Sequence, residues 1–294
     1  MTTESVLRAE IVEVGRRMYA RGYTASNDGN ISVRLGDDRL LMTPRSVCKG
    51  FMTPDMMCIT DLNGKKLQGD RDPSSEMLMH LEVYRQRPDA RAVCHAHPPI
   101  ATGFAVAGIP LDRAVLAEVL TTLGSVPIAE YATPSTPELP AAVRKYVKAH
   151  DGMLLANHGA LTLGTDLMSA YYKLETIEHF AKISLVARLL GRENLLAREE
   201  VDRLQGLRSS YGIKAPAPIC PDPSVLADLL TGPDQVSCQV VQAPAGDGRR
   251  LVPDQTDMKR TLPTPSSSPD GDEEIRLTYR ELSALIEDAI RSLR

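Results

Sequence analysis

The first regularity along the chain is a helical spacing of apolar residues near its start. The stripe consists of Val6, Ile11, Val14 and Met18. It predicts an amphipathic helix over residues 6–19. Residues 77–86 also favour a helix, and a longer periodic run follows Asp166, whose side chain suits an N-cap. Gly191 closes that run, so the sequence predicts a long helix that ends at residue 190.

Short runs with the character of strands lie between these helices. They cover residues 31–35, 39–43, 57–60 and 90–94, with two further short strands within 152–163. The polar turn Gly36-Asp37-Asp38 separates the first two runs, and Asp61-Leu62-Asn63-Gly64 follows the third, as in hairpins. The pattern therefore predicts a mixed α/β fold.

The composition changes after residue 210. Prolines become frequent, and residues 261–272 are almost purely Pro, Ser, Thr, Gly and Asp, which is a linker composition. Helical periodicity then returns in a stripe made of Leu277, Leu282, Leu285, Ile286, Ala289, Ile290 and Leu293. We divide the chain accordingly into a folded domain over 1–212, a Pro-rich extension and linker over 213–274, and an amphipathic helix over 275–294.

Charge and composition narrow the function classes. The chain has 294 residues, of which 43% are hydrophobic, enough for a substantial core. A net charge of -4 gives none of the positive field that nucleic-acid binding needs. The start of the chain lacks the features of a signal peptide, and no apolar run is long enough to span a bilayer. We therefore expect a cytoplasmic protein with no nucleic-acid and no membrane partner.

Histidines, rather than cysteines, carry a metal-binding pattern. The five cysteines include no CxxC pair and fit neither a disulfide framework nor a thiolate zinc site. His95 and His97 lie at the end of a predicted strand, where alternation sends both side chains to the same face. His158 ends another strand, before Gly159. Three neutral imidazoles with an open position are typical of a catalytic zinc site, although isolated histidines can equally be satisfied core or surface residues.

Two segments suit an anion. Ser74 and Ser75 precede the predicted helix that follows Glu76, so their hydroxyls and the first-turn amides can form a cradle at the positive end of the helix dipole. The alternative reading of this segment is a simple helix cap. A second cradle is the loop 27–30, whose Asn and Gly residues suit unusual backbone angles, although it can equally be a turn.

Several dispersed motifs together resemble one family. They are Gly29-Asn30-Ile31-Ser32-Val33-Arg34, Thr43-Pro44 followed by Lys49-Gly50, Pro73-Ser74-Ser75-Glu76 with His80, His95-Ala96-His97-Pro98 and Asn157-His158-Gly159-Ala160. Their order and spacing over residues 6–190 resemble the class II aldolase/adducin family, which includes L-fuculose-phosphate aldolase, L-rhamnulose-phosphate aldolase and L-ribulose-5-phosphate 4-epimerase. The resemblance implies a three-layer α/β/α domain over 1–212, with a central, largely antiparallel sheet, and a homotetramer.

The resemblance also assigns roles. It implies that His95, His97 and His158 bind Zn²⁺ and that Glu76 is the acid/base and can also ligate the resting metal. The residues that match the family's phosphate contacts are Asn30, Ser74 and Ser75. The implied reaction is reversible aldol cleavage of a ketose 1-phosphate, of the L-fuculose 1-phosphate type, to dihydroxyacetone phosphate and a small aldehyde such as lactaldehyde.

Departures from the family keep alternatives open. Glu76 favours an aldolase, because the epimerases have Asp there, but Ser46 replaces a family glycine. The tyrosine that the fuculose enzyme carries has no counterpart within 114–122. Tyr211 is a candidate for the C-terminal tyrosine that closes a neighbouring subunit's site, or it simply packs. The alternative functions are a pentulose-phosphate 4-epimerase, a zinc-dependent decarboxylase and a non-catalytic scaffold of the adducin type.

The predicted helix over 275–294 needs a partner for its apolar stripe. Its mixed charges and lack of Trp and Phe speak against a membrane. It resembles the encapsulation peptides that bind enzymes to the shell proteins of bacterial microcompartments, which gives a second expected location. An oligomerisation helix or an inert tail are the alternatives.

Overall fold

Strands from both halves of the domain join one sheet in the computed structural model of the chain, which describes residues 3–213. The strands are β1 (Asn30–Leu35), β2 (Arg39–Met42), β3 (Cys58–Asp61), β4 (Lys66–Gln68), β5 (Ala92–Ala96), β6 (Ile128–Ala129), β7 (Gly152–Leu155) and β8 (Gly159–Gly164). The sheet has eight strands in the order β4-β3-β2-β1-β5-β8-β7-β6. The β6–β7 pair is parallel and the other pairs are antiparallel, which confirms the predicted mixed, largely antiparallel sheet.

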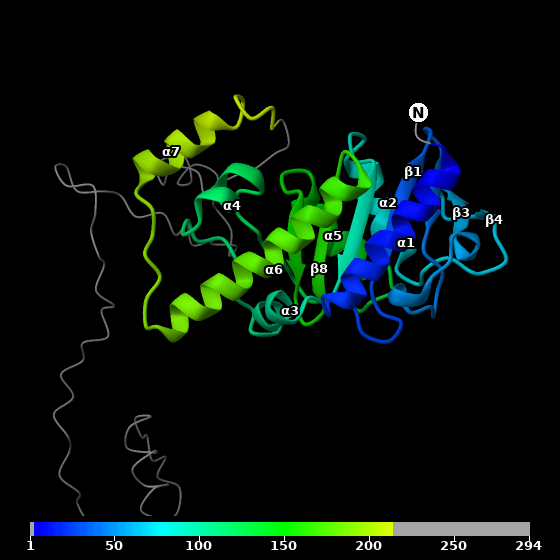
Figure 1. Ribbon diagram of the computed structural model, residues 1–294, viewed down its shortest axis with the longest axis horizontal. Helices are drawn as coiled ribbons and strands as arrows, with labels where there is room; N and C mark the ends of the chain where they lie inside the picture. Colours follow the sequence, from blue (N-terminus) through cyan, green and yellow to red (C-terminus); the bar gives the residue numbers. More distant parts are fainter. Residues whose placement is uncertain (1–2, 214–294) are drawn as a thin grey trace, which may run out of the picture. The chain divides into compact units, whose positions relative to one another are not determined.

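Helices cover both faces of this sheet (Figure 1). One face packs against α1 (Glu4–Ala20), α3 (Pro99–Val106) and α6 (Leu167–Leu189), and the other packs against α2 (Met77–Gln86) and α5 (Glu138–Val147). Strand β5 shows the division, because Cys94 belongs to the first core and Val93 to the second. The expected three layers are therefore confirmed.

The remaining helices are short. They are η1 (Lys49–Phe51), η2 (Pro54–Met56), α4 (Ala117–Thr122) and α7 (Arg198–Leu207). A small apolar cluster that includes Leu120 of α4 and Val201 of α7 packs these two helices together. Among residues 3–213, no helix combines the length and the apolar character that crossing a membrane would require.

Local chemistry explains the ends of the long helix α6. The Asp166 side chain accepts a hydrogen bond from the Ser169 amide at 2.7 Å, and Gly191 adopts a φ of +92° after the last turn. Both features agree with the sequence prediction. The predicted linker and C-terminal helix lie outside the described residues.

Strand pairing brings the candidate site together. Asn30 at the start of β1 pairs with His95 near the end of β5, and Ala96 pairs with Ala160 in β8. The β7–β8 turn carries His158 to the same end of the sheet. Residues that are far apart in the sequence thus meet where β1, β5 and β8 adjoin.

Candidate metal centre and active site

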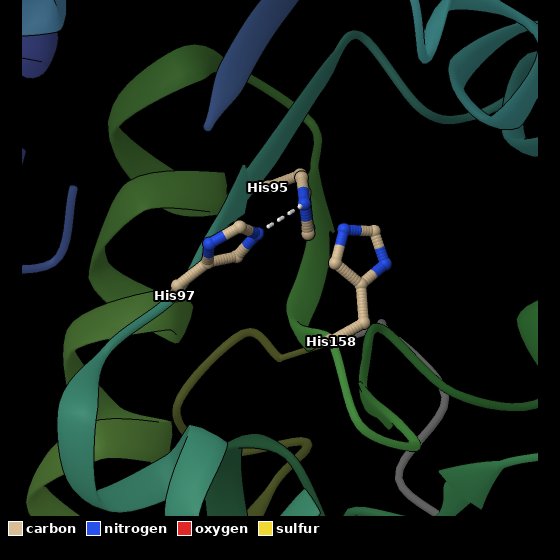
Figure 2. A group of neighbouring side chains, drawn as sticks. All are labelled: His95, His97 and His158. Carbon is tan, nitrogen blue, oxygen red and sulfur yellow. Dashed lines mark hydrogen bonds between the residues drawn. The ribbon is translucent and has the colours of Figure 1, made fainter. Parts of the chain in front are cut away.

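Three histidines converge at this end of the sheet. His95 lies in β5, His97 follows that strand, and His158 lies in the turn before β8. Figure 2 shows the three imidazole rings facing one another, and their centroids are 4.6 to 5.0 Å apart. One ligand atom from each ring lies within 4.8 Å of the other two. The convergence of His95 and His97 that strand alternation predicted is therefore confirmed.

Hydrogen bonds fix which nitrogens face the centre. His95 donates from Nδ1 to the Ala160 carbonyl at 2.9 Å, and His97 donates from Nδ1 to the Asp28 carboxylate at 3.0 Å. Because those oxygens only accept, each Nε2 of a neutral ring keeps its lone pair. Burial lowers the pKa of both imidazoles, which favours the neutral form. The two Nε2 atoms are 3.2 Å apart, so two lone pairs point toward the same space.

Glu76 completes the arrangement. It occupies the N-cap position of α2 but makes no side-chain capping bond. Its Oε2 lies 3.3 Å from His95 Nε2 and its Oε1 lies 3.1 Å from His158 Nε2. Among the described residues, neither Oε1 of Glu76 nor Nδ1 of His158, both buried, has a hydrogen-bond partner. A divalent cation among neutral imidazoles and a carboxylate fits this donor set.

Glu76 is ionised in this setting. Burial works to raise the pKa of its carboxyl, whereas attraction to a protonated His95 or His158 ring and the hydrogen bond from the Asn30 amide lower it by more. The pKa of Glu76 therefore lies well below its ordinary value. The Glu76 carboxylate makes no capping bond and turns toward the histidines, whereas the Ser74 hydroxyl accepts from the Glu76 amide at 3.3 Å, as a helix cap can.

A chain of buried hydrogen bonds holds the Glu76 carboxylate from behind. Asn30 donates from its amide nitrogen to Oε2 of Glu76 at 2.7 Å, and Asn30 Oδ1 accepts from His80 Nε2 at 2.5 Å. His80 Nδ1 accepts in turn from the Ser32 hydroxyl at 2.7 Å. Burial lowers the pKa of His80 to about 4, which keeps it neutral. Sequence reasoning noted His80 only as part of a motif, although its place four residues after Glu76 on a helix puts both on one face.

An open cavity of about 580 Å³ lies in front of these groups. Its lining includes the predicted residues Asn30, Ser46, Ser74, Ser75, Glu76, His97 and His158, and also Asp28 of the loop proposed as a second cradle. Arg45 and Lys49, for which the sequence predicted no role, line it as well. His95 is fully buried behind this lining. Tyr211 is 66% exposed and does not line the cavity, so its proposed role stays a prediction.

Ser46 stands where the family resemblance implies a glycine, and the backbone geometry explains that preference. This residue has a φ of +57°, in the left-handed region that glycine adopts most readily. The glycine that the family resemblance implies at this position would suit the same turn. The chain keeps the conformation with a serine, whose side chain lies at the cavity.

The fold and the site together define an enzyme of the metal-dependent aldolase type. Residues 9–185 match the family described as Class II Aldolase and Adducin N-terminal domain. The chain therefore belongs to the class II aldolase and adducin family, which confirms the resemblance drawn from the motifs. Its enzymatic relatives set the non-catalytic scaffold alternative aside.

Similar proteins include enzymes of two activities. The chain is 31% identical over 190 residues to 3-oxo-tetronate 4-phosphate decarboxylase of Pectobacterium atrosepticum, covering 63% of this chain and 87% of the relative. It is 32% identical to L-fuculose phosphate aldolase of Methanococcus maripaludis, covering 60% and 95%. A solved structure of L-fuculose 1-phosphate aldolase superposes with a TM-score of 0.65 at 32% identity, covering 70% of this chain and 97% of that one.

Proposed function

We propose that the protein catalyses reversible aldol cleavage of a ketose 1-phosphate, of the L-fuculose 1-phosphate type, to dihydroxyacetone phosphate and a small aldehyde such as lactaldehyde. One observation carries this proposal. The Glu76 carboxylate lies between His95 and His158, at 3.3 and 3.1 Å, in a cavity that Ser74 and Ser75 also line. The proposed proton carrier, metal ligands and phosphate donors therefore lie at the same cavity.

The three histidines would hold the metal, which we propose to be zinc, with Glu76 as an additional ligand of the resting site. When bound, the ion supplies positive charge that stabilises the negative charge developing on the substrate oxygens. In the cleavage direction the C4 hydroxyl loses its proton, the C3–C4 bond breaks, and its electron pair moves toward the C2 carbonyl. C3 then takes up a proton. Glu76 is the group placed to carry protons in this sequence.

The phosphate is expected at the start of α2. Ser74 is buried and its hydroxyl accepts from the Glu76 amide at 3.3 Å, while Ser75 is exposed to the cavity. The positive end of the helix dipole adds a favourable field for an anion. Arg45 lines the same cavity and supplies a positive charge. Asn30 also lines it and has a second amide proton beyond the one it donates to Glu76.

A decarboxylase is the second candidate. The similarity to 3-oxo-tetronate 4-phosphate decarboxylase favours it. Loss of carbon dioxide from a 3-oxo acid also leaves an electron pair next to a carbonyl, so it needs the same stabilising charge and the same proton carrier. The two candidates differ in whether the lost fragment is an aldehyde or carbon dioxide.

Product analysis separates them. Purified, zinc-loaded protein is incubated with L-fuculose 1-phosphate, 5-deoxyribulose 1-phosphate and 3-oxo-tetronate 4-phosphate, and dihydroxyacetone phosphate and carbon dioxide are measured. We expect dihydroxyacetone phosphate from a ketose 1-phosphate. Carbon dioxide from the sugar acid, with no aldol product, would replace the aldolase proposal with the decarboxylase. The Glu76→Gln variant serves as the control for background reaction.

Assembly and location are proposed on sequence grounds. We expect a homotetramer, which light scattering tests. Residues 275–294 lie outside the described part of the chain, and the proposal that they bind a microcompartment shell protein is supported by their periodicity alone. A reporter fused to this segment should join shells in a host that makes them, and Leu285→Asp with Ile290→Asp should abolish that recruitment. A reporter that stays diffuse beside intact shells would end the targeting proposal.

A further inference from the structure

The two oxygens of Asp28 have separate partners. Oδ1 accepts from the Ala25 amide at 2.6 Å and so closes the loop that precedes β1. Oδ2 accepts from Nδ1 of His97 at 3.0 Å. One side chain therefore ties the shape of its own loop to the orientation of a metal-ligating ring.

The loop is held tightly against the end of β5. Gly29 has a φ of +69°, and a Cβ added to it would lie 2.6 Å from the Thr24 side chain and 3.0 Å from the His95 carbonyl oxygen. The His97 amide donates to the Tyr23 carbonyl at 2.9 Å. Backbone contacts on both sides thus fix the distance between the loop and the strand end.

Lys49 holds the same loop from the other side. Its side chain is buried, and its ammonium donates to the carbonyls of Val47 at 2.6 Å and Asn27 at 3.2 Å. Burial lowers the pKa of this lysine to about 8, and the charge of Asp28 partly opposes that effect. The Asp28 carboxylate is therefore positioned before any ligand binds.

We propose that Asp28 is a positioning residue for the metal centre. It keeps the proton of His97 on Nδ1 and the ring in one orientation, so that the Nε2 lone pair is directed at the ion. The Ala160 backbone carbonyl orients the His95 ring in the same way, and no side-chain substitution removes that carbonyl. Hydrogen bonding from the outer nitrogen of a ligating histidine typically accounts for about 10-fold to 100-fold in metal affinity. The inference rests on the zinc site of the proposed function.

Asp28→Asn is the sharpest variant. An asparagine has nearly the same shape and still offers an oxygen to the Ala25 amide. It presents an N–H group to His97, and that group pairs with Nδ1 only if the ring proton moves to Nε2, where it blocks the ligand lone pair. Asp37→Asn is the matched control, because Asp37 is an exposed residue of the β1–β2 turn and the change in net charge is the same.

Zinc affinity is measured on the metal-free full-length proteins by competition with a chromophoric chelator. We expect Asp28→Asn to bind zinc about 10-fold to 100-fold more weakly than the native protein, and Asp37→Asn to match the native value. Long-range ¹H–¹⁵N NMR of the ring nitrogens should show His97 protonated on Nδ1 in the native protein and altered in Asp28→Asn. Thermal unfolding of the metal-free proteins checks that both variants fold.

The outcomes separate the two proposals. One outcome is that the native protein binds zinc and Asp28→Asn shows the same zinc affinity and the same His97 tautomer. This outcome overturns the role of Asp28 and leaves the proposed function standing. If the native protein binds no zinc, both proposals fall. If Asp28→Asn does not fold, Asp28→Ser replaces it, because a serine hydroxyl can still cap the Ala25 amide but is too short to reach His97.

Discussion

The Asn30 side chain donates to Oε2 of Glu76 at 2.7 Å, so a residue expected at the phosphate is bonded to the proposed acid/base. His80 fixes the orientation of this amide, because its Nε2 donates to Asn30 Oδ1 and leaves the amide nitrogen facing Glu76. The contact places Asn30, at the start of β1, behind Glu76, which directly precedes α2. A phosphate contact by Asn30 stays a prediction, and it would use the second amide proton.

Loss of any one ligating histidine should strip the metal. We expect His95→Ala, His97→Ala and His158→Ala each to be purified with little zinc, since two imidazoles hold the ion poorly. Elemental analysis of the purified variants measures the zinc content per chain. His179→Ala is the control, because His179 is an exposed residue of α6. Full occupancy in any of the three variants would remove that residue from the ligand set.

Glu76→Gln should fold and keep measurable metal while losing turnover. Glutamine retains the shape of the side chain but cannot carry the proton, an effect of about 10²-fold to 10⁴-fold on kcat. Steady-state kinetics with the best substrate provides the measurement, and Glu199→Gln on the exposed start of α7 is the control. Near-native turnover by Glu76→Gln would move the proton carrier elsewhere.

Paired substitution of Ser74 and Ser75 by alanine should act on the phosphate alone. We expect KM for the phosphorylated ketose to rise by about 10-fold or more, because each charge-assisted hydrogen bond lost weakens binding. Turnover of the unphosphorylated sugar should hardly change. Equal losses with both sugars would indicate a general defect at the start of α2.

The sequence predicted the elements with strong periodicity and the groups that chemistry singles out. Helix α2 begins and ends where the pattern indicated, and the convergence of His95 and His97 followed from strand alternation. Strand β5 begins and ends two residues later than predicted, and its pairing with β8 runs from Ala92 to Ala96. Helices α3 and α5 were not predicted, since their short apolar stripes become informative only against a neighbouring sheet. The Asp28–His97 contact joins residues 69 positions apart, which no local pattern reveals.

Gly159→Ala should disturb the site through packing. A Cβ there would lie 2.5 Å from the Ala96 carbonyl oxygen and 2.6 Å from Cδ2 of His97. We expect a loss of about 1–3 kcal/mol in the free energy of unfolding, together with weaker zinc binding. Gly103→Ala is the matched control. On helix α3 its Cβ would meet none of the described residues within 4 Å, so alanine should stabilise by up to about 1 kcal/mol. Urea unfolding measures both changes.

His80 should make stability depend on pH. Burial lowers its pKa from 6.5 to about 4 in the folded state, with the charge of Glu76 partly opposing this effect. Between these two values the unfolded chain binds more protons, so the free energy of unfolding falls as the pH falls from about 6.5 to 4. The expected contribution is about 3 kcal/mol. Denaturant unfolding of the metal-free native protein and of His80→Gln should show a shallower pH dependence in the variant, and parallel curves would contradict the assignment.

The three histidines can come together during folding only after β5 has paired with β8. This pairing brings His95 opposite Leu161, across a separation of 66 residues, and the ligand set is incomplete until the pairing has formed. Contacts of such long range form late in folding, after the loss of chain entropy that they require. An ion held by the three histidines would therefore not nucleate this domain in the way that zinc nucleates a zinc finger, whose ligands are close in sequence. Such an ion would join a sheet that the apoprotein has already formed.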